Sequence, residues 1–119
     1  MRRLRVHNPS RKATLADRAL IADTSKTRKT GLLKHHRLEP GEGLWLTPCE
    51  GVHTVGMKFP IDVLFLDKRR KVVKIRAGMA RWRMSACFRA YSVLELPSGT
   101  AAATKTAAGD QLEFETYES

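Results

Sequence analysis

The sequence predicts a mainly β fold: a small β sandwich or partly closed barrel with one or two short helices. Short apolar runs rich in β-branched and aromatic residues recur along the chain and are bounded by turn residues, which is typical of strands. At most two short segments carry a helical pattern. No internal repeat or linker interrupts the 119 residues, so we expect a single domain, residues 1–119, with a core of its own.

The clearest strand is residues 61–66, where five of six side chains are apolar. A run this short and this apolar predicts a strand that is buried on both faces. Pro60 suits its first position, because the missing N–H breaks no interior ladder bond there. Asp62 lies inside the strand, and burying an unpaired carboxylate costs several kcal/mol. We therefore expect Asp62 to be buried or half-buried and paired, with Arg28 as one possible partner.

The other elements follow from the same patterns. Further strands are predicted at 3–7, 19–22, 44–47, 72–75, 92–96 and 111–117. A weak apolar face predicts a helix at 26–35, capped by Thr24 or Ser25, with Gly31 inside it for close packing. The alanine-rich residues 100–108 predict one short helical turn, and residues 77–90 read as an irregular loop that crosses the core.

Charge is distributed unevenly along this basic chain, whose net charge is +10. Residues 1–89 hold 21 Lys and Arg against 7 Asp and Glu, whereas residues 90–119 hold one Lys against five acids. A pI near 10.2 raises nucleic-acid binding as a hypothesis. No recognition helix, zinc-finger spacing or aromatic-basic RNA-binding signature accompanies it. Weak, nonspecific binding at low salt is the expectation.

The sequence predicts no membrane span, because no stretch approaches the roughly 20 apolar residues that a spanning helix needs. The charged start, residues 1–8, resembles the first part of a signal peptide, but no apolar segment follows it. We therefore expect a cytoplasmic protein. In that reducing compartment the two cysteines, Cys49 and Cys87, are expected to behave as small hydrophobic residues.

Side chains that could bind a ligand or take part in catalysis cluster before and within the predicted strand at 61–66. We expect any functional site to lie in residues 49–58, since loops at strand mouths expose polar groups while the sheet holds them rigid. Cys87 would join this site from the 77–90 loop. The candidate ligand-binding residues are Cys49, His53, Thr54, Met57, Lys58, Asp62 and Cys87.

Three interpretations of this cluster remain open. His53 and Asp62 could pair beside a nucleophilic Cys49 or Thr54. Cys49, His53 and Cys87 could form a soft metal site. No hydrolase signature, CxxC or HxxxH pattern supports either chemistry. Ordinary structural roles are therefore preferred, and we predict no metal, no cofactor and no assigned catalytic residue.

A second acidic residue interrupts an apolar strand. Glu95 lies within the predicted strand at 92–96 and is a candidate buried or edge carboxylate. Arg28 or Lys58 could pair with it.

Five segments in order carry a resemblance to a known family: TRKTGLL at 27–33, GLWL at 43–46, MKFPIDVLFLD at 57–67, VLELPSG at 93–99 and GD at 109–110. Over residues 19–114 the chain resembles the bacterial and archaeal domain-of-unknown-function 192 family. It departs from that family at Gly56 to Phe59, where Trp-Met-Lys-Asn is common, and in the basic turn at 68–71. The resemblance implies a small β sandwich of jelly-roll type and brings no established activity.

Three functions are compatible with these observations. The preferred one is a non-enzymatic binding or accessory module that offers a cleft or face to a protein or small ligand. The alternatives are an electrostatic nucleic-acid binder and an enzyme or metal site around His53. Fold alone does not choose among them.

Overall fold

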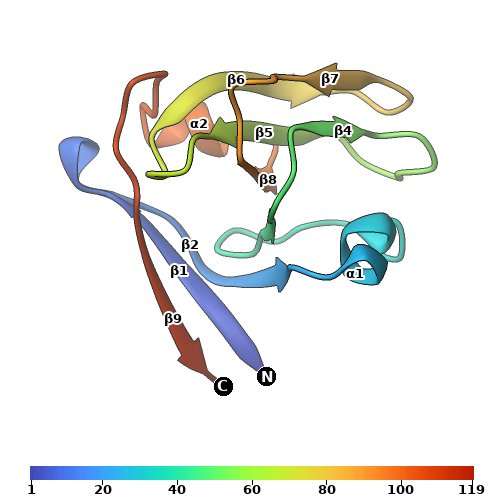
Figure 1. The fold of residues 1–119 in the computed structure, drawn as a ribbon, viewed down its shortest axis with the longest axis horizontal. Coiled ribbons are helices and arrows are strands. Elements are labelled where there is room, and N and C mark those ends of the chain that lie inside the picture. Colours follow the sequence, from blue (N-terminus) through green and yellow to red (C-terminus); the bar gives the residue numbers. More distant parts are fainter.

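The computed structural model describes residues 1–119 and arranges nine strands as a seven-stranded sheet and a two-stranded ribbon (Figure 1). The sheet contains β1 (Arg2–Asn8), β2 (Ala13–Ala22), β3 (Leu44–Leu46), β5 (Ile61–Leu66), β6 (Val72–Met79), β8 (Ser92–Pro97) and β9 (Glu113–Glu118). The ribbon pairs β4 (Gly51–His53) with β7 (Met84–Ala86). The helices are α1 (Ser25–Thr30), α2 (Thr100–Ala103) and a 3-10 turn, η1 (Pro9–Arg11).

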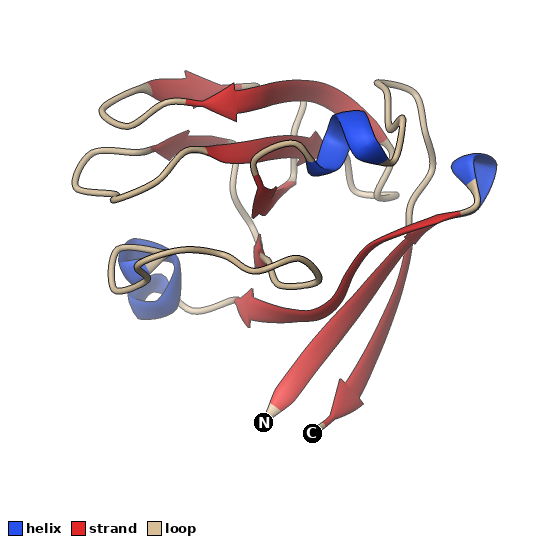
Figure 2. Cartoon of the chain, turned by 180° about the vertical axis from the view of Figure 1, so that it is seen from behind, coloured by secondary structure: helices blue, strands red, loops and turns tan.

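The sheet order is β6-β5-β8-β3-β2-β1-β9, and every pair is antiparallel except β2 with β3. The predicted mainly β fold with two short helices is confirmed (Figure 2). The sheet is not closed into a barrel, although an isolated bridge between Lys71 and Gln111 joins the chain near its two edges. The sandwich or jelly-roll arrangement stays a prediction.

Strand β5 is central because its side chains fill both faces of the sheet. All six of its residues are buried, as the apolar run predicts. Leu64 and Leu66 join one hydrophobic cluster, which β1, β2 and β8 complete. Ile61, Val63 and Phe65 join a second cluster on the opposite face, with residues from β3 and the loop after α1. Each such side chain contributes about 1.5–3 kcal/mol when it is buried.

Asp62 is fully buried on the β5 face that carries Leu64, and its partners are backbone groups. Its carboxylate accepts hydrogen bonds from the N–H groups of Gly78 at 2.7 Å, Gly99 at 3.2 Å and Ala101 at 2.8 Å. The expected burial and pairing are observed. The expected partner Arg28 was wrong, because backbone donors satisfy the carboxylate instead.

Helix α1 is shorter than the residues 26–35 that the sequence predicted. Thr24 and Thr27 form a reciprocal capping box at its start. Gly31 ends the helix with a φ of +49°, and its N–H bonds to the Thr27 carbonyl at 2.9 Å. The prediction of Gly31 as an interior packing residue was wrong, because a β-carbon disfavours this backbone conformation and the helix stops here.

The 77–90 segment is more regular than predicted. Strand β6 continues to Met79, and β7 pairs with β4 through three residues on each side. The irregular core-crossing loop was therefore wrong. Strands β4 and β7 are stabilised by pairing with each other, so neither needs a strong strand pattern in its own sequence. Strand β2 likewise begins at Ala13, well before the predicted start at residue 19.

No helix in the structure is long and apolar enough to cross a membrane.

Candidate ligand-binding pocket

A pocket of about 270 Å³ lies on the face of the sheet that carries the second hydrophobic cluster. Residues 28–33, from α1 and the turn after it, form one side. Pro48, Cys49 and residues 51–53 form another side. Leu46, Met57 and Glu95 are buried and complete the lining.

Glu95 is the chemically unusual residue of this pocket. It lies on β8 between Leu44 of β3 and Val63 of β5, and only 4% of it is exposed. No group of the protein donates a hydrogen bond to its carboxyl, and no cation lies within ion-pair distance. Burial raises the pKa of Glu95 from 4.5 to about 7, because the charged form loses its hydration. Near neutral pH the carboxyl therefore changes charge readily.

Arg28 and Lys58 were the expected partners of Glu95, and both expectations were wrong. The guanidinium of Arg28 lines the pocket, but its Nη1 donates to the carbonyl of Thr47 at 3.2 Å. The ammonium of Lys58 is exposed and lies 3.4 Å from Nδ1 of His36. The carboxyl of Glu95 is left without a protein partner.

Cys49 is held as a thiol. Its Sγ donates to the carbonyl of Gly51 at 3.1 Å. Burial raises the pKa of this thiol, and the hydrogen bond to Gly51 and the charge of Arg28 offset only part of that rise. The thiolate is the nucleophilic form of cysteine, so this environment disfavours covalent chemistry at neutral pH.

Three of the seven candidate residues line this pocket: Cys49, His53 and Met57. Thr54 is buried next to it, where its Oγ1 donates to the Ala80 carbonyl at 2.6 Å and accepts from the Arg83 N–H at 2.8 Å. Thr54 thus joins two loops, and its hydroxyl proton is already donated within the protein.

The other three candidates lie outside the pocket lining. Lys58 points to solvent beside His36, and Asp62 bonds to backbone groups on the opposite face of β5. Cys87 is half-buried against the second hydrophobic cluster, and its N–H bonds to the Glu50 carbonyl at 2.8 Å. Both cysteines are free.

The structure assembles neither of the two reactive constellations. Asp62 accepts three backbone hydrogen bonds, whereas His53 is exposed on β4, so the imidazole has no carboxylate partner there. No group of three or more His, Cys, Asp or Glu side chains is placed to hold a metal ion, so Cys49, His53 and Cys87 do not form a ligand set.

Glu95 and residues 28–33 belong to the pocket but were not among the predicted site residues. The sequence signal for Glu95 was an acidic residue within the apolar strand predicted at 92–96. Its pocket neighbours could not be predicted, because Cys49 and α1 are distant in sequence and come close to β8 only in the folded sheet.

The sequence profile of DUF192, described as an uncharacterized ACR family, matches residues 6–114. The chain belongs to this family. The match confirms the resemblance and extends it toward the N-terminus. The search of curated proteins found no match.

Two crystal structures share the fold. One is a protein of unknown function from Novosphingobium aromaticivorans, 24% identical, with a TM-score of 0.78 over 93% of this chain and 83% of that one. The other is a Sinorhizobium meliloti protein provisionally described as a transcription regulator. It is 22% identical, with a TM-score of 0.82 over 95% of this chain and 92% of that one. Both similarities establish the fold alone.

Proposed function

We propose that this DUF192 protein is a non-enzymatic binding module whose pocket takes a small ligand carrying a cationic or N–H donor group. The observation that carries the proposal is the carboxyl of Glu95, buried in the pocket lining without a partner. The carboxyl faces the pocket and has lost most of its hydration, and a hydrogen bond that involves a charged group contributes about 1.5–3 kcal/mol. A ligand that donates to Glu95 supplies that hydrogen bond.

The rest of the lining suits a short apolar body. Leu46, Val52 and Met57 supply apolar walls, and a volume of about 270 Å³ suits a small ligand, because pockets for drug-sized ligands start at about 300 Å³. Alkyl amines and alkyl guanidines combine these features. Binding such a cation favours the ionised form of Glu95, so affinity should rise as pH rises through about 7.

Two features favour binding over catalysis in this proposal. The pKa of Cys49 is raised by burial, which keeps the residue in its weakly nucleophilic form. His53 has no carboxylate partner to orient it, a feature that His-assisted nucleophiles need.

Two finer expectations belong to the same proposal. We propose that the sheet and ribbon form a sandwich of jelly-roll type, which two hydrophobic clusters on opposite faces of β5 support. We also propose a bacterial, cytoplasmic protein, in keeping with its free cysteines.

A second candidate function is weak electrostatic binding of nucleic acid. The net charge of +10 favours it, and the Sinorhizobium meliloti relative is provisionally described as a transcription regulator. No element of the structure resembles a recognition helix, so this candidate depends on charge alone.

Titration of the isotope-labelled protein with butylamine, butylguanidine and butanol, followed by NMR, tests the pocket proposal. We expect the two cations, but not the alcohol, to shift the signals of Leu46 and Met57. Glu95→Gln should weaken their binding about tenfold or more, the value of a charge-assisted hydrogen bond. Glu50→Gln is the matched control, because Glu50 is exposed, lies beside Cys49 and does not line the pocket. Equal binding to wild type and Glu95→Gln would refute the proposal.

A further inference from the structure

Three loops meet at one end of the molecule, which we name the loop end: residues 31–37, 54–60 and 80–84 (Figure 1). The N–H of Trp82 bonds to the Thr54 carbonyl at 3.2 Å, and the Thr54 N–H bonds to the Arg83 carbonyl at 2.8 Å. The Leu33 side chain lies next to Gly56, which joins the first loop to the second. The three loops therefore form one continuous surface.

The loop end exposes large apolar side chains on each of its loops. Leu33 is 37% exposed, Val55 42%, Trp82 60% and Met84 77%. These four are more than half of the exposed large hydrophobic residues of the whole chain. Single exposed apolar residues are ordinary, but a group on joined loops marks an interaction surface.

The same three loops carry several cations and no acid. The three loops contain Lys34, Arg37, Lys58, Arg81 and Arg83 and no Asp or Glu. Only Arg37 forms a salt bridge, with Glu39. Residues 68–94 also contain no Asp or Glu, and none of the six salt bridges includes a cation from that stretch. Apart from Arg37, the cations of the loop end therefore have no acidic partner.

We propose that the loop end docks on a membrane surface rich in anionic phospholipid. The apolar tips enter the boundary between headgroups and acyl chains, and the cations meet the lipid phosphates. This surface adjoins the pocket and shares Leu33 with its lining, but the docking proposal does not depend on what the pocket binds.

The composition of the tips favours a bilayer over a nucleic acid. Leu33, Val55 and Met84 are aliphatic or thioether side chains that gain nothing from stacking on bases, whereas single-strand binders use several aromatic platforms. Trp82 is the one well-exposed aromatic residue of the loop end, and tryptophan favours the membrane–water interface. An anionic bilayer suits both the apolar side chains and the cations, since it has an apolar layer directly beneath a negative surface.

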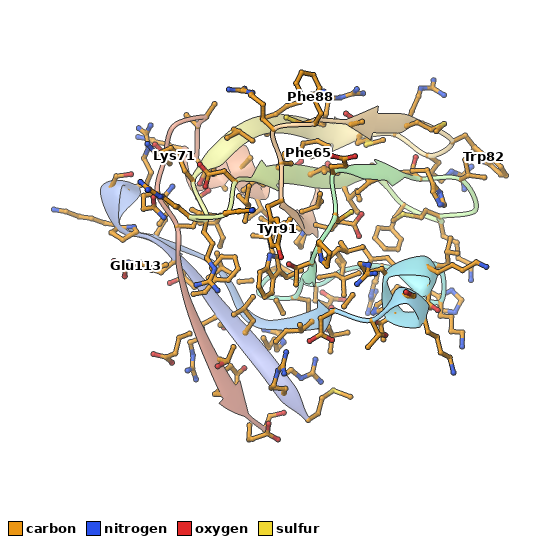
Figure 3. The ribbon with its side chains drawn as sticks, in the orientation of Figure 1. Phe65, Lys71, Trp82, Phe88, Tyr91 and Glu113 are labelled. Atoms are coloured by element: carbon orange, nitrogen blue, oxygen red, sulfur yellow. The ribbon has the colours of Figure 1, made fainter.

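Trp82 also allows a test that spares the fold. Its φ is +63°, a left-handed conformation that glycine adopts more readily than tryptophan. Trp82→Gly therefore removes the side chain without straining the loop. Figure 3 places Trp82 and Lys71 on opposite sides of the molecule. Arg69 and Lys71, both exposed, thus provide a charge-matched control pair far from the loop end.

Co-sedimentation of the full chain with vesicles tests the proposal. We expect partitioning onto phosphatidylcholine vesicles that contain phosphatidylglycerol and none onto phosphatidylcholine alone. Each cation near an anionic surface contributes on the order of a fivefold gain, so Arg81→Ala with Arg83→Ala should lower partitioning roughly 25-fold. Arg69→Ala with Lys71→Ala should lower it by no more than about threefold, through net charge alone. Trp82→Gly should lower it about tenfold.

Two further measurements keep the proposal open to refutation. In a Trp45→Phe background the fluorescence of Trp82 should shift to the blue on phosphatidylglycerol vesicles. Leu33→Ser with Val55→Ser tests insertion without touching Trp82 and should also weaken binding. Equal losses for the two arginine and lysine pairs would show diffuse attraction and overturn the proposal. So would absent vesicle binding, or a single-stranded oligonucleotide that shifts Trp82 fluorescence and displaces the vesicles.

Discussion

The carboxylate of Asp62 accepts a 2.8 Å hydrogen bond from the backbone N–H of Ala101, a residue 39 positions later in the chain. The same carboxylate holds Gly78 at the end of β6 and Gly99 before α2. One buried acid in the central strand therefore anchors two connections that have no direct pairing with each other.

Replacing Asp62 should destabilise the protein. Asp62→Ala leaves three N–H groups without their acceptor, and that of Ala101 is buried, so we expect a loss of about 1–3 kcal/mol in the free energy of unfolding, measured in urea. Asp23→Ala is the control, because Asp23 is exposed and pairs with Arg2 at the surface, where such a pair contributes less than about 1 kcal/mol. An unchanged melting temperature for Asp62→Ala would contradict this role.

Glu95 should make stability fall with rising pH. Its folded pKa of about 7 exceeds the ordinary 4.5, so its favourable contribution is fully present below pH 4.5 and is lost as pH rises through 7. The difference corresponds to about 3 kcal/mol as an upper bound. Glu95→Gln cannot ionise, so its stability relative to wild type should increase between pH 5 and about 8. Urea unfolding at several pH values measures this, and parallel profiles for the two proteins would contradict it.

Cys49 should react slowly with alkylating agents. Burial raises the pKa of its thiol and limits access, so in a Cys87→Ser background we expect iodoacetamide to modify the folded protein roughly tenfold more slowly than the urea-unfolded one. Mass spectrometry over time gives both rates. Faster alkylation of the folded protein would revive the nucleophile hypothesis.

Nucleic-acid binding should be weak and dependent on salt. The excess of cations predicts that labelled single-stranded and duplex oligonucleotides bind at low salt with no sequence preference. Fluorescence anisotropy should show little binding near about 0.2 M salt, because released counterions drive the interaction. Tight binding that persists there and distinguishes sequences would indicate a genuine nucleic-acid module.

The sequence by itself determined the central strands. Residues 61–66 and 92–96 are predominantly apolar, and a strand with two buried faces needs such a segment wherever it lies in the sheet. The charged residues within these runs, Asp62 and Glu95, were visible for the same reason. Family membership also followed from the order of the local motifs.

Only the tertiary structure decided the different surroundings of Asp62 and Glu95. The backbone N–H groups that satisfy Asp62 come from β6 and the start of α2, whereas Glu95 faces a pocket whose other walls are α1 and residues 48–53. The ribbon of β4 and β7 arose in the same way, since each three-residue strand is stabilised by the other. Hydrogen-bond partners and pocket walls come from residues distant in sequence, and only the register of the sheet brings them together.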